Sequence, residues 1–390
     1  MRHPFTRRQI LRAGAATSLL PFVAACASQA TPEVNNAPQT ELLASGNSIP
    51  LDSLIPEARK EGLLSTMTLP HDWANYGKII ETYREKYLIA INEINPPGSS
   101  QDEVDAIKAH QEDKGPLAPD VVDMGLGFAE SSKAEGLFAP YKVATWDTIP
   151  EGLKDPEGHW YCSYYGVFAF EVNREVVKNV PRDWSDLLKP EYKGMVALGG
   201  DPTRSSMATN SVWAAGLSQT DSLDDAPEAG MEFFAELHKV GNLVPTIGLP
   251  STVANGQTPI LIFWDFLALG DRDKSAGTTD IEVVVPESGV FGVPSIQAIS
   301  AYAPHPFAAR LWEEFLYSDE GQLLWLEGYA HPIRYNDLVK NNKVPAELAA
   351  RLPAAELYAR AVFPTSAAQT DQAKKLINEG WVSKVGVEIK

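Results

Sequence analysis

The chain has 390 residues, and 51 acidic side chains against 33 lysines and arginines give it a formal net charge of −18. A surface this acidic repels phosphate backbones, and no block of basic residues interrupts it, so nucleic acid is excluded as a partner. The two cysteines, Cys26 and Cys162, and the seven histidines show no zinc-site spacing, so no structural zinc site is predicted, and no cofactor is expected. This length, with 44% hydrophobic residues, suffices for two lobes.

Residues 1–26 have the layout of a removable export signal. Arg7 and Arg8 precede an uncharged apolar run, residues 13–25, that stops at Cys26. The run is shorter than the roughly 20 apolar residues that span a membrane, and Gly14 and Pro21 interrupt it. We therefore predict a signal rather than a permanent membrane span.

Two details of this segment indicate the export pathway and how the segment is processed. TRRQIL resembles a twin-arginine export signal, and VAAC at residues 23–26 resembles a bacterial lipobox, whose cysteine is lipidated and becomes the first residue of the mature protein. The alternative is an ordinary cleavage site with an incidental cysteine. Lipidation of Cys26 predicts an extracytoplasmic protein, in the periplasm or on the outer face, attached to the membrane through its lipid alone.

The next elements in chain order are a polar segment and two series of strands and helices. Residues 27–49 are rich in Ala, Ser, Asn, Pro and Gln without apolar periodicity, which predicts a flexible tether. From residue 63, short apolar runs alternate with amphipathic segments, and a second such series begins near Val167. This alternation is typical of an α/β protein with helices on both faces of its sheets.

Ligands of open α/β sheets bind beyond the carboxyl ends of the strands, so we take the residues that follow each apolar run as candidates. Serines before a helix can instead be caps, and free backbone N–H groups there also favour anions. The predicted ligand-binding residues are His71, Asp72, Trp73, Ser99, Ser100, Gln101, Asp123, Tyr165, Arg204, Ser205, Ser206, Trp264 and Asp265.

The segment HPFAARLWEEFLYSDEGQLLWLEGYAHPIR, residues 305–334, resembles the closing part of ABC-transporter solute-binding proteins of the iron, polyamine and phosphonate group. EGLFAPY at 135–141, WSDLLKPEYKGMVALGGDP at 184–202 and TPILIFWD at 258–265 follow the order of that family. The resemblance implies two α/β lobes with mixed sheets flanked by helices, joined by hinge strands. Lobe 1 would comprise residues 50–166 and 281–390, and lobe 2 residues 167–280. It also implies a monomer that binds a small solute between the lobes and delivers it to ABC permease subunits.

The nature of the solute is left open between three readings. Trp264 can attract an alkylammonium group through its ring face and Asp265 can neutralise it, as expected for a polyamine. Arg204 with Ser205 and Ser206 favours a phosphonate, phosphate or carboxylate. A zwitterion or a phosphorylated polyol could bind both groups of residues at once. We prefer a solute of this kind.

The third reading is ferric iron. Iron-binding relatives carry two adjacent tyrosines where this chain has residues 263–266, FWDF, and the pair Tyr164–Tyr165 lies elsewhere, before the first crossing strand. Iron would then need His71, Asp72 and Asp265.

No enzymatic activity is expected. The chain contains no Gly-x-Ser-x-Gly elbow, no His-Glu-x-x-His helix and no phosphate-binding loop of the Walker type. An exported hydrolase, with His71 beside Asp72 as a general base, is the alternative of a different class.

Overall fold

The computed structural model describes residues 37–390 and divides the chain into two units, residues 1–41 and 42–390. The predicted export signal and Cys26 lie outside the described residues. The second unit begins within helix α1 (Ala37–Ala44). No helix in the described part of the chain combines the length and the apolar character required to cross a membrane.

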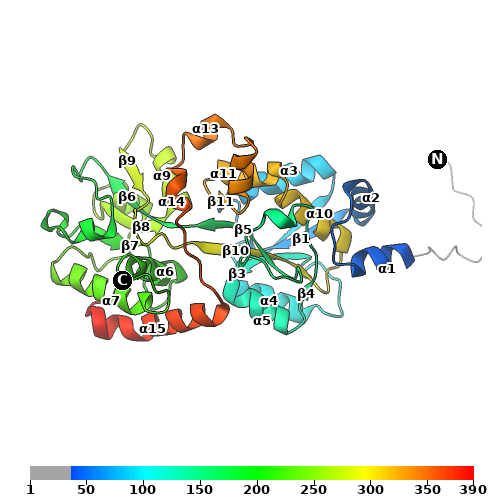
Figure 1. The fold of residues 1–390 in the computed structure, drawn as a ribbon, viewed down its shortest axis with the longest axis horizontal. Helices are drawn as coiled ribbons and strands as arrows, with labels where there is room; N and C mark the ends of the chain where they lie inside the picture. Colours follow the sequence, from blue (N-terminus) through cyan, green and yellow to red (C-terminus); the bar gives the residue numbers. More distant parts are fainter. Residues whose placement is uncertain (1–36) are drawn as a thin grey trace, which may run out of the picture. The chain divides into compact units, whose positions relative to one another are not determined.

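The first lobe is built on a sheet that, among the described residues, has seven strands in the order β11-β5-β10-β3-β1-β2, with β4 paired to β10 (Figure 1). β1 is parallel to β2 and β3, because helices connect these strands, whereas β10 is antiparallel to both β3 and β5. The strands are β1 (Leu63–Met67), β2 (Ala90–Ile94), β3 (Val121–Gly125), β4 (Phe138–Ala139), β5 (Tyr161–Gly166), β10 (Val293–Ser300) and β11 (His331–Pro332).

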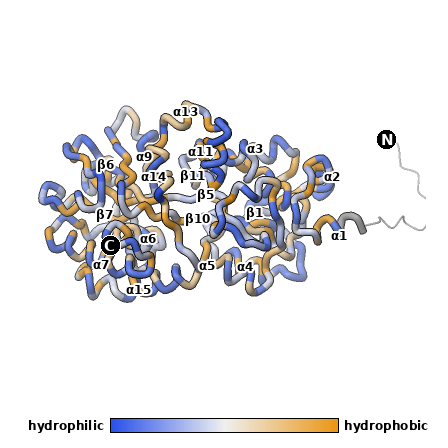
Figure 2. The backbone as a smooth tube through the Cα atoms, viewed as in Figure 1, coloured by the Kyte–Doolittle hydropathy of each residue, from blue (hydrophilic) through white to orange (hydrophobic). Residues whose placement is uncertain are grey.

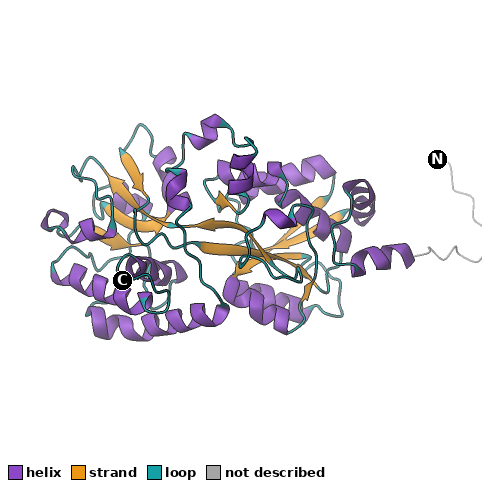
Figure 3. Ribbon diagram, viewed as in Figure 1, coloured by secondary structure: helices purple, strands orange, loops and turns teal. Residues whose placement is uncertain are grey.

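Helices flank this mixed sheet, as Figure 3 shows. Each helix between two parallel strands buries an apolar stripe, as α3 does with Ile79, Ile80 and Tyr83. The helices of this lobe include α2 (Leu51–Glu61), α3 (Tyr76–Tyr87), α4 (Ser100–Ala109), α5 (Leu126–Ala134), α10 (Pro306–Leu316), α11 (Asp319–Glu327), α12 (Tyr335–Lys340), α13 (Ala346–Ala349) and α14 (Ala355–Tyr358).

The second lobe contains a four-stranded sheet in the order β7-β8-β6-β9, counted over the described residues. β7 (Val196–Leu198) is parallel to β8 (Ile260–Trp264), and β6 (Phe168–Asn173) is antiparallel to both β8 and β9 (Ile281–Val284). Its helices are α6 (Ser206–Leu217), α7 (Ala226–Lys239), α8 (Pro250–Ala254), α9 (Asp265–Lys274) and α15 (Ala367–Val385).

Three segments cross between the lobes. β5 continues through Val167 into β6, the segment 285–292 joins β9 to β10, and the segment 359–366 leads from α14 to α15. The last two are joined by backbone hydrogen bonds from Val362 N to Val290 O and from Gly292 N to Val362 O, both 2.9 Å. The crossing strands are therefore tied to one another as well as to the sheets.

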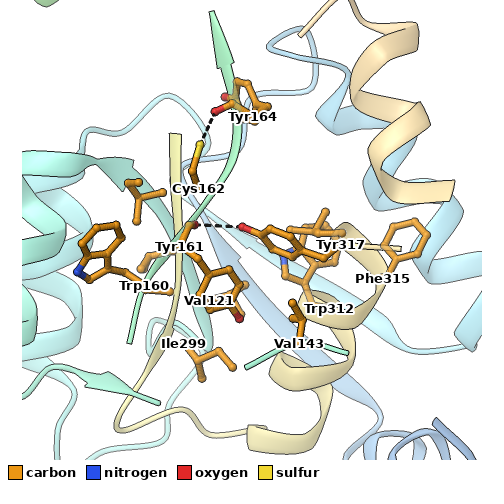
Figure 4. Close-up of a cluster of buried hydrophobic side chains, with 14 of the residues drawn as sticks. Val121, Val143, Trp160, Tyr161, Cys162, Tyr164, Ile299, Trp312, Phe315 and Tyr317 are labelled. Carbon is orange, nitrogen blue, oxygen red and sulfur yellow. Dashed lines mark hydrogen bonds between the residues drawn. The ribbon is translucent and has the colours of Figure 1, made fainter. Parts of the chain in front are cut away.

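Each lobe has its own hydrophobic core. In the first, Tyr161 and Tyr317 pack edge to face at 4.9 Å, and the Tyr317 hydroxyl donates to the Tyr161 carbonyl at 3.0 Å (Figure 4). The second core includes Trp184, Trp213 and Trp381, all fully buried. In both lobes hydrophobic and hydrophilic residues alternate along much of the backbone (Figure 2), because many helices and strands bury only one face.

The lobe boundary predicted at residue 281 is wrong in two places. β9 pairs with β6 and so belongs to the second sheet. α15 buries Ala373, Ile377 and Trp381 in the second core, so the last helix of the C-terminal segment also packs there. The sequence pattern predicted that β9 is a strand and that α15 is a helix. It did not indicate in which of the two cores each of them packs.

The predicted tether, residues 27–49, ends earlier than expected. Residues 37–44 form α1, and Ile49 is buried, with its N–H donating to the Tyr141 hydroxyl at 3.2 Å. The Ser48 hydroxyl donates to Glu314 at 2.8 Å. These contacts attach residues 48 and 49 to the first lobe, although the sequence around them is polar.

Candidate functional site

A cavity of about 520 Å³ lies between the two lobes, and we call it the cleft. The carboxyl ends of β1, β3 and β8, the start of three helices and the β5–β6 crossing meet there, as expected for an α/β sheet protein. It is lined by Thr68, Pro70, Trp73, Tyr76, Pro97, Gly98, Ser99, Ser100, Asp123, Met124, Gly125, Tyr164, Gly166, Ser206, Trp264, Phe266, Val293, Pro294 and Ser295.

Asp123 is the charged side chain of this lining, and it lies at the end of β3 on the wall of the first lobe. Its carboxylate accepts hydrogen bonds from the hydroxyls of Tyr76 and Ser295, and the Gln297 amide donates to the Tyr76 hydroxyl at 3.1 Å. Burial raises the pKa of Asp123 to about 6, although the hydroxyl donors oppose this shift. The carboxylate is therefore ionised at neutral pH and held in one orientation.

Aromatic rings form most of the wall around Asp123. The Trp73 indole N–H donates to the Tyr164 hydroxyl at 2.8 Å, and Tyr76 and Tyr164 pack edge to face at 6.4 Å. From the second lobe, Phe266 approaches Trp73 at 5.3 Å between ring centroids. The rings of the two lobes thus meet at the cleft.

Trp264, at the end of β8, belongs to the wall that the second lobe contributes to the cleft. Phe168 stacks on its indole at 4.3 Å, and the side chain keeps 8% of its surface exposed, at the cleft. Phe168 fixes the indole plane, because a stacked neighbour leaves little room for rotation. Trp264 therefore presents a preformed ring surface to a ligand.

Three helices begin at the cleft. Ser99 caps α4, with its hydroxyl accepting from Asp102 N at 3.4 Å, Ser206 is the first residue of α6, and α5 follows Gly125. The Gly125 N–H donates to the Ser100 hydroxyl at 3.3 Å, which joins two of these helix ends. Helix N-termini carry partial positive charge, so this side of the cleft favours electron-rich oxygen atoms.

Six of the residues predicted from the sequence line the cleft: Trp73, Ser99, Ser100, Asp123, Ser206 and Trp264. The other seven do not, and each has a different local environment. His71 is exposed and pairs with Glu93 at 2.6 Å, Asp72 is exposed, and the Gln101 amide donates to Asp105 at 2.9 Å. These three side chains lie outside the cleft lining. The turn between β1 and α3, which carries His71 and Asp72, and the first turn of α4, which carries Gln101, each expose one face to solvent.

Arg204 and Ser205 contribute to a different cavity, of about 650 Å³, together with Lys390. Ser205 caps α6 through Ala208 N at 3.3 Å, which turns its side chain to the helix rather than the cleft. The predicted anion site at Arg204 is therefore not part of the cleft.

Tyr165 and Asp265 are also corrected by the structure. Successive strand residues face opposite sides, so Tyr164 lines the cleft while Tyr165 lines a separate cavity behind β5. Asp265 is fully buried, accepting from Val167 N at 2.9 Å and from the Tyr358 hydroxyl at 2.7 Å. Burial raises its pKa to about 7. Asp265 therefore fastens the crossing segment instead of facing the cleft.

Tyr76, Phe266 and Ser295 also line the cleft but were not predicted from the sequence, and Tyr164 was not assigned to the site. Tyr76 and Phe266 lie in the first turns of helices, three residues past Trp73 and one residue past Asp265, and Ser295 lies within a strand. No sequence signal marked Tyr164, because all residues of β5 are buried and its sequence does not show which of the two tyrosines faces the cleft.

The described residues contain one group of three acidic and histidine side chains close enough to hold a metal ion: Asp155, Glu157 and His159. Lys133 pairs with both Asp155 and Glu157, and the group does not line the cleft. The cleft itself offers one carboxylate and tyrosine hydroxyls, which is fewer charged oxygen donors than a hard trivalent cation needs.

Comparison with known proteins gives a family-level match. The model of the family described as bacterial extracellular solute-binding protein matches residues 118–359. An uncharacterised protein of Haemophilus influenzae is 30% identical over 260 residues, covering 64% of this chain and 71% of the relative. A probable ABC transporter periplasmic-binding protein of Sinorhizobium fredii is 28% identical over 172 residues, covering 42% of this chain and 46% of the relative.

Solved structures agree on the fold. Iron-bound HitA from Pseudomonas aeruginosa has a TM-score of 0.60 at 18% identity, covering 83% of this chain and 99% of that one. AfuA from Actinobacillus pleuropneumoniae, with fructose-6-phosphate bound, has a TM-score of 0.58 at 20% identity with the same coverage. The predicted two-lobe fold with mixed, helix-flanked sheets is thereby confirmed. The two neighbours bind unlike solutes, so the fold alone does not identify a ligand.

Proposed function

Because this chain belongs to the bacterial extracellular solute-binding protein family of ABC transporters, we propose that it captures a small organic cation in its cleft and delivers it to a permease. The observation that carries this proposal is that Asp123 is the one charged side chain among the described residues lining the cleft, and aromatic rings surround it. The family and the fold are those of receptors rather than enzymes.

The chemistry of the Asp123 wall favours an alkylammonium group. A carboxylate in a partly dehydrated site attracts a cation more strongly than it would in water, and ring faces add about 0.5–2 kcal/mol of cation–π attraction. Trp73, Tyr76 and Tyr164 supply these rings beside Asp123. An anionic solute without a cationic group would meet an uncompensated negative charge at this wall.

The serine side of the cleft favours an oxygen-bearing group on the same solute. Ser99, Ser100 and Ser206 lie at helix N-termini, where hydroxyl, carboxylate or phosphate oxygens are stabilised. We therefore prefer an amine that carries such a group, as in a zwitterion, over a simple polyamine. Without Arg204 in the cleft, a phosphorylated polyol that lacks nitrogen loses the cationic partner that the sequence had suggested.

Ferric iron remains the second candidate, supported by the iron-bound structural neighbour. The tyrosines and Asp123 at the cleft would be its ligands in this chain. Their hydroxyl and carboxylate oxygens already bond to one another and to Trp73, which supports an organic solute over a metal.

We also propose a location for the protein outside the cytoplasm. The family acts outside the cytoplasm, and TRRQIL with Cys26 supports twin-arginine export followed by lipid anchoring of a monomer. Replacing Cys26 with Ala should abolish incorporation of labelled palmitate in the native host. Equal labelling of the variant would contradict the anchor.

Native mass spectrometry of protein purified from its host tests the solute class directly. We expect a retained molecule of small mass that contains an amine nitrogen, and we expect Asp123→Asn protein to lose it. Asp105→Asn, which alters an exposed carboxylate of α4 outside the cleft lining, is the matched control and should retain it. A retained metal ion, or a nitrogen-free phosphate ester, would contradict the proposal.

A further inference from the structure

A second cavity, of about 430 Å³, lies behind β5 on the opposite side of the strand from the cleft. We call it the rear cavity. Tyr165 of β5, His331 of β11, Tyr335 of α12, and Tyr358 and Phe363 near the third crossing provide its rings. Its lining residues belong to the first lobe and the crossing segment 359–365, so its walls do not depend on the position of the second sheet.

The rings of the rear cavity are arranged around His331. The imidazole lies parallel to Tyr358 at 4.2 Å and tilted against Tyr335 and Tyr165 at 4.4 and 4.7 Å. Phe363 meets Tyr165 edge to face at 4.9 Å. This arrangement is as rich in aromatic rings as the cleft, and none of these rings lines the cleft.

His331 is the imidazole of the rear cavity, whose lining also includes the polar side chains Glu151, Asn336 and Thr365. The side chain is 4% exposed, its buried Nδ1 has no hydrogen-bond partner, and no hydrogen bond from a described residue reaches the imidazole. Burial without a carboxylate partner lowers the pKa of His331, to about 3, so the ring is neutral at physiological pH. A neutral imidazole donates a hydrogen bond from one ring nitrogen and accepts at the other, and His331 lines the cavity.

We propose that the rear cavity is a second ligand site, which takes an uncharged aromatic molecule bearing one hydroxyl or amide group. The rings supply a stacking surface, and His331 supplies the hydrogen bond that the ligand's polar group requires. A surrounding that disfavours the charged imidazole equally disfavours a charged ligand. The rear cavity and the cleft therefore select different chemistries on the two sides of one strand.

The test is calorimetric titration of the full-length protein with 2-naphthol and with naphthalene. Wild type should bind 2-naphthol about five- to tenfold more tightly than naphthalene, the range expected for one hydrogen bond. His331→Phe keeps the ring and its stacking, so it should bind the two probes about equally. Ala361→Phe, which fills the rear cavity from a partly exposed position, should remove binding of both.

Trp264→Ala distinguishes binding in the rear cavity from binding in the cleft, because Trp264 lines the cleft and not the rear cavity. It should leave 2-naphthol binding unchanged. The proposal is overturned if wild type shows no saturable binding, if Trp264→Ala abolishes it, or if His331→Phe preserves the preference for 2-naphthol. A thermal melt of each variant checks that the fold is intact.

Discussion

Trp264 and Asp265 are neighbours in the chain with separate roles, and the difference arises at a single turn. Trp264 ends β8 with its ring at the cleft, whereas Asp265 begins α9 with its carboxylate directed to Val167 and Tyr358. The sequence predicted both as ligands because both follow an apolar run. The direction of a side chain at the start of a helix depends on tertiary partners that the local pattern does not contain.

Truncation of Trp264 should weaken solute binding without unfolding the protein. We expect Trp264→Ala to raise the Kd about five- to thirtyfold, since about 1–2 kcal/mol of ring–cation attraction and contact is lost. Trp264→Phe keeps a ring face over the solute and should show a smaller loss. Calorimetric titration measures both variants, and wild-type affinity in Trp264→Ala would remove this residue from the site.

Replacement of Asp265 should change how stability depends on pH. Its folded pKa of about 7 lies above the unfolded value of about 3.9, so the folded state holds the extra proton between these limits. The unfolding free energy of wild type therefore falls as pH rises through this window, by at most about 1.4 kcal/mol per pH unit from this group. Asp265→Asn lacks this dependence and can still bond to Val167 N and the Tyr358 hydroxyl.

Thermal melts at about pH 5 and about pH 8 make the comparison. The melting temperature of Asp265→Asn relative to wild type should rise between the two values. A constant difference between variant and wild type would show that the buried carboxyl does not titrate in this range.

At the scale of elements, the sequence predicted most strands and helices but not how they are shared between lobes. Apolar runs such as ILIFW and helix signals such as Ser99 and Ser205 marked β8, α4 and α6 closely. β5, with the sequence YCSYYG, was missed because all its residues are buried and no polar alternation marks it. Burial on both faces removes the period that sequence reading depends on.

Helix α15 is the element whose placement was least predictable from the sequence, and its contribution to stability can be measured. Trp381 is fully buried against Phe234 at 5.5 Å, and its indole N–H has no partner, so its contribution is one of packing. Trp381→Ala should lower the unfolding free energy by about 3–5 kcal/mol. The neighbouring Val382→Ala is the control, because Val382 is 47% exposed and should change little.

Urea unfolding followed by circular dichroism gives both values. An equally small effect of the two substitutions would mean that α15 adds little to the second core.

At the scale of the whole described unit, the resemblance in residues 305–334 predicted the fold, whereas the site was only half predicted. Asp123 and Trp264 were found because strand ends converge on the cleft. Tyr76 and Ser295, which orient Asp123, come from a helix and a strand far from it in the sequence. Only folding brings such partners together.

A solute held between the lobes should bring them closer. Its differential affinity for the closed form shifts the population, and residues on both walls contribute to that difference. Small-angle scattering of wild type should therefore give a smaller radius of gyration when the retained solute is added back. Full occupancy with an unchanged radius would contradict closure while leaving the site itself in place.

The central claim is that an ionised Asp123 holds a cationic solute, and the pH dependence of affinity tests it most directly. Protonation of a carboxyl with a pKa of about 6 competes with a bound ammonium group. Titration of wild type with its retained solute should therefore give a Kd about tenfold higher at about pH 5 than at about pH 7.5, while Asp123→Asn binds weakly with no such change. An affinity that is independent of pH in wild type, or that survives in Asp123→Asn, would contradict the account.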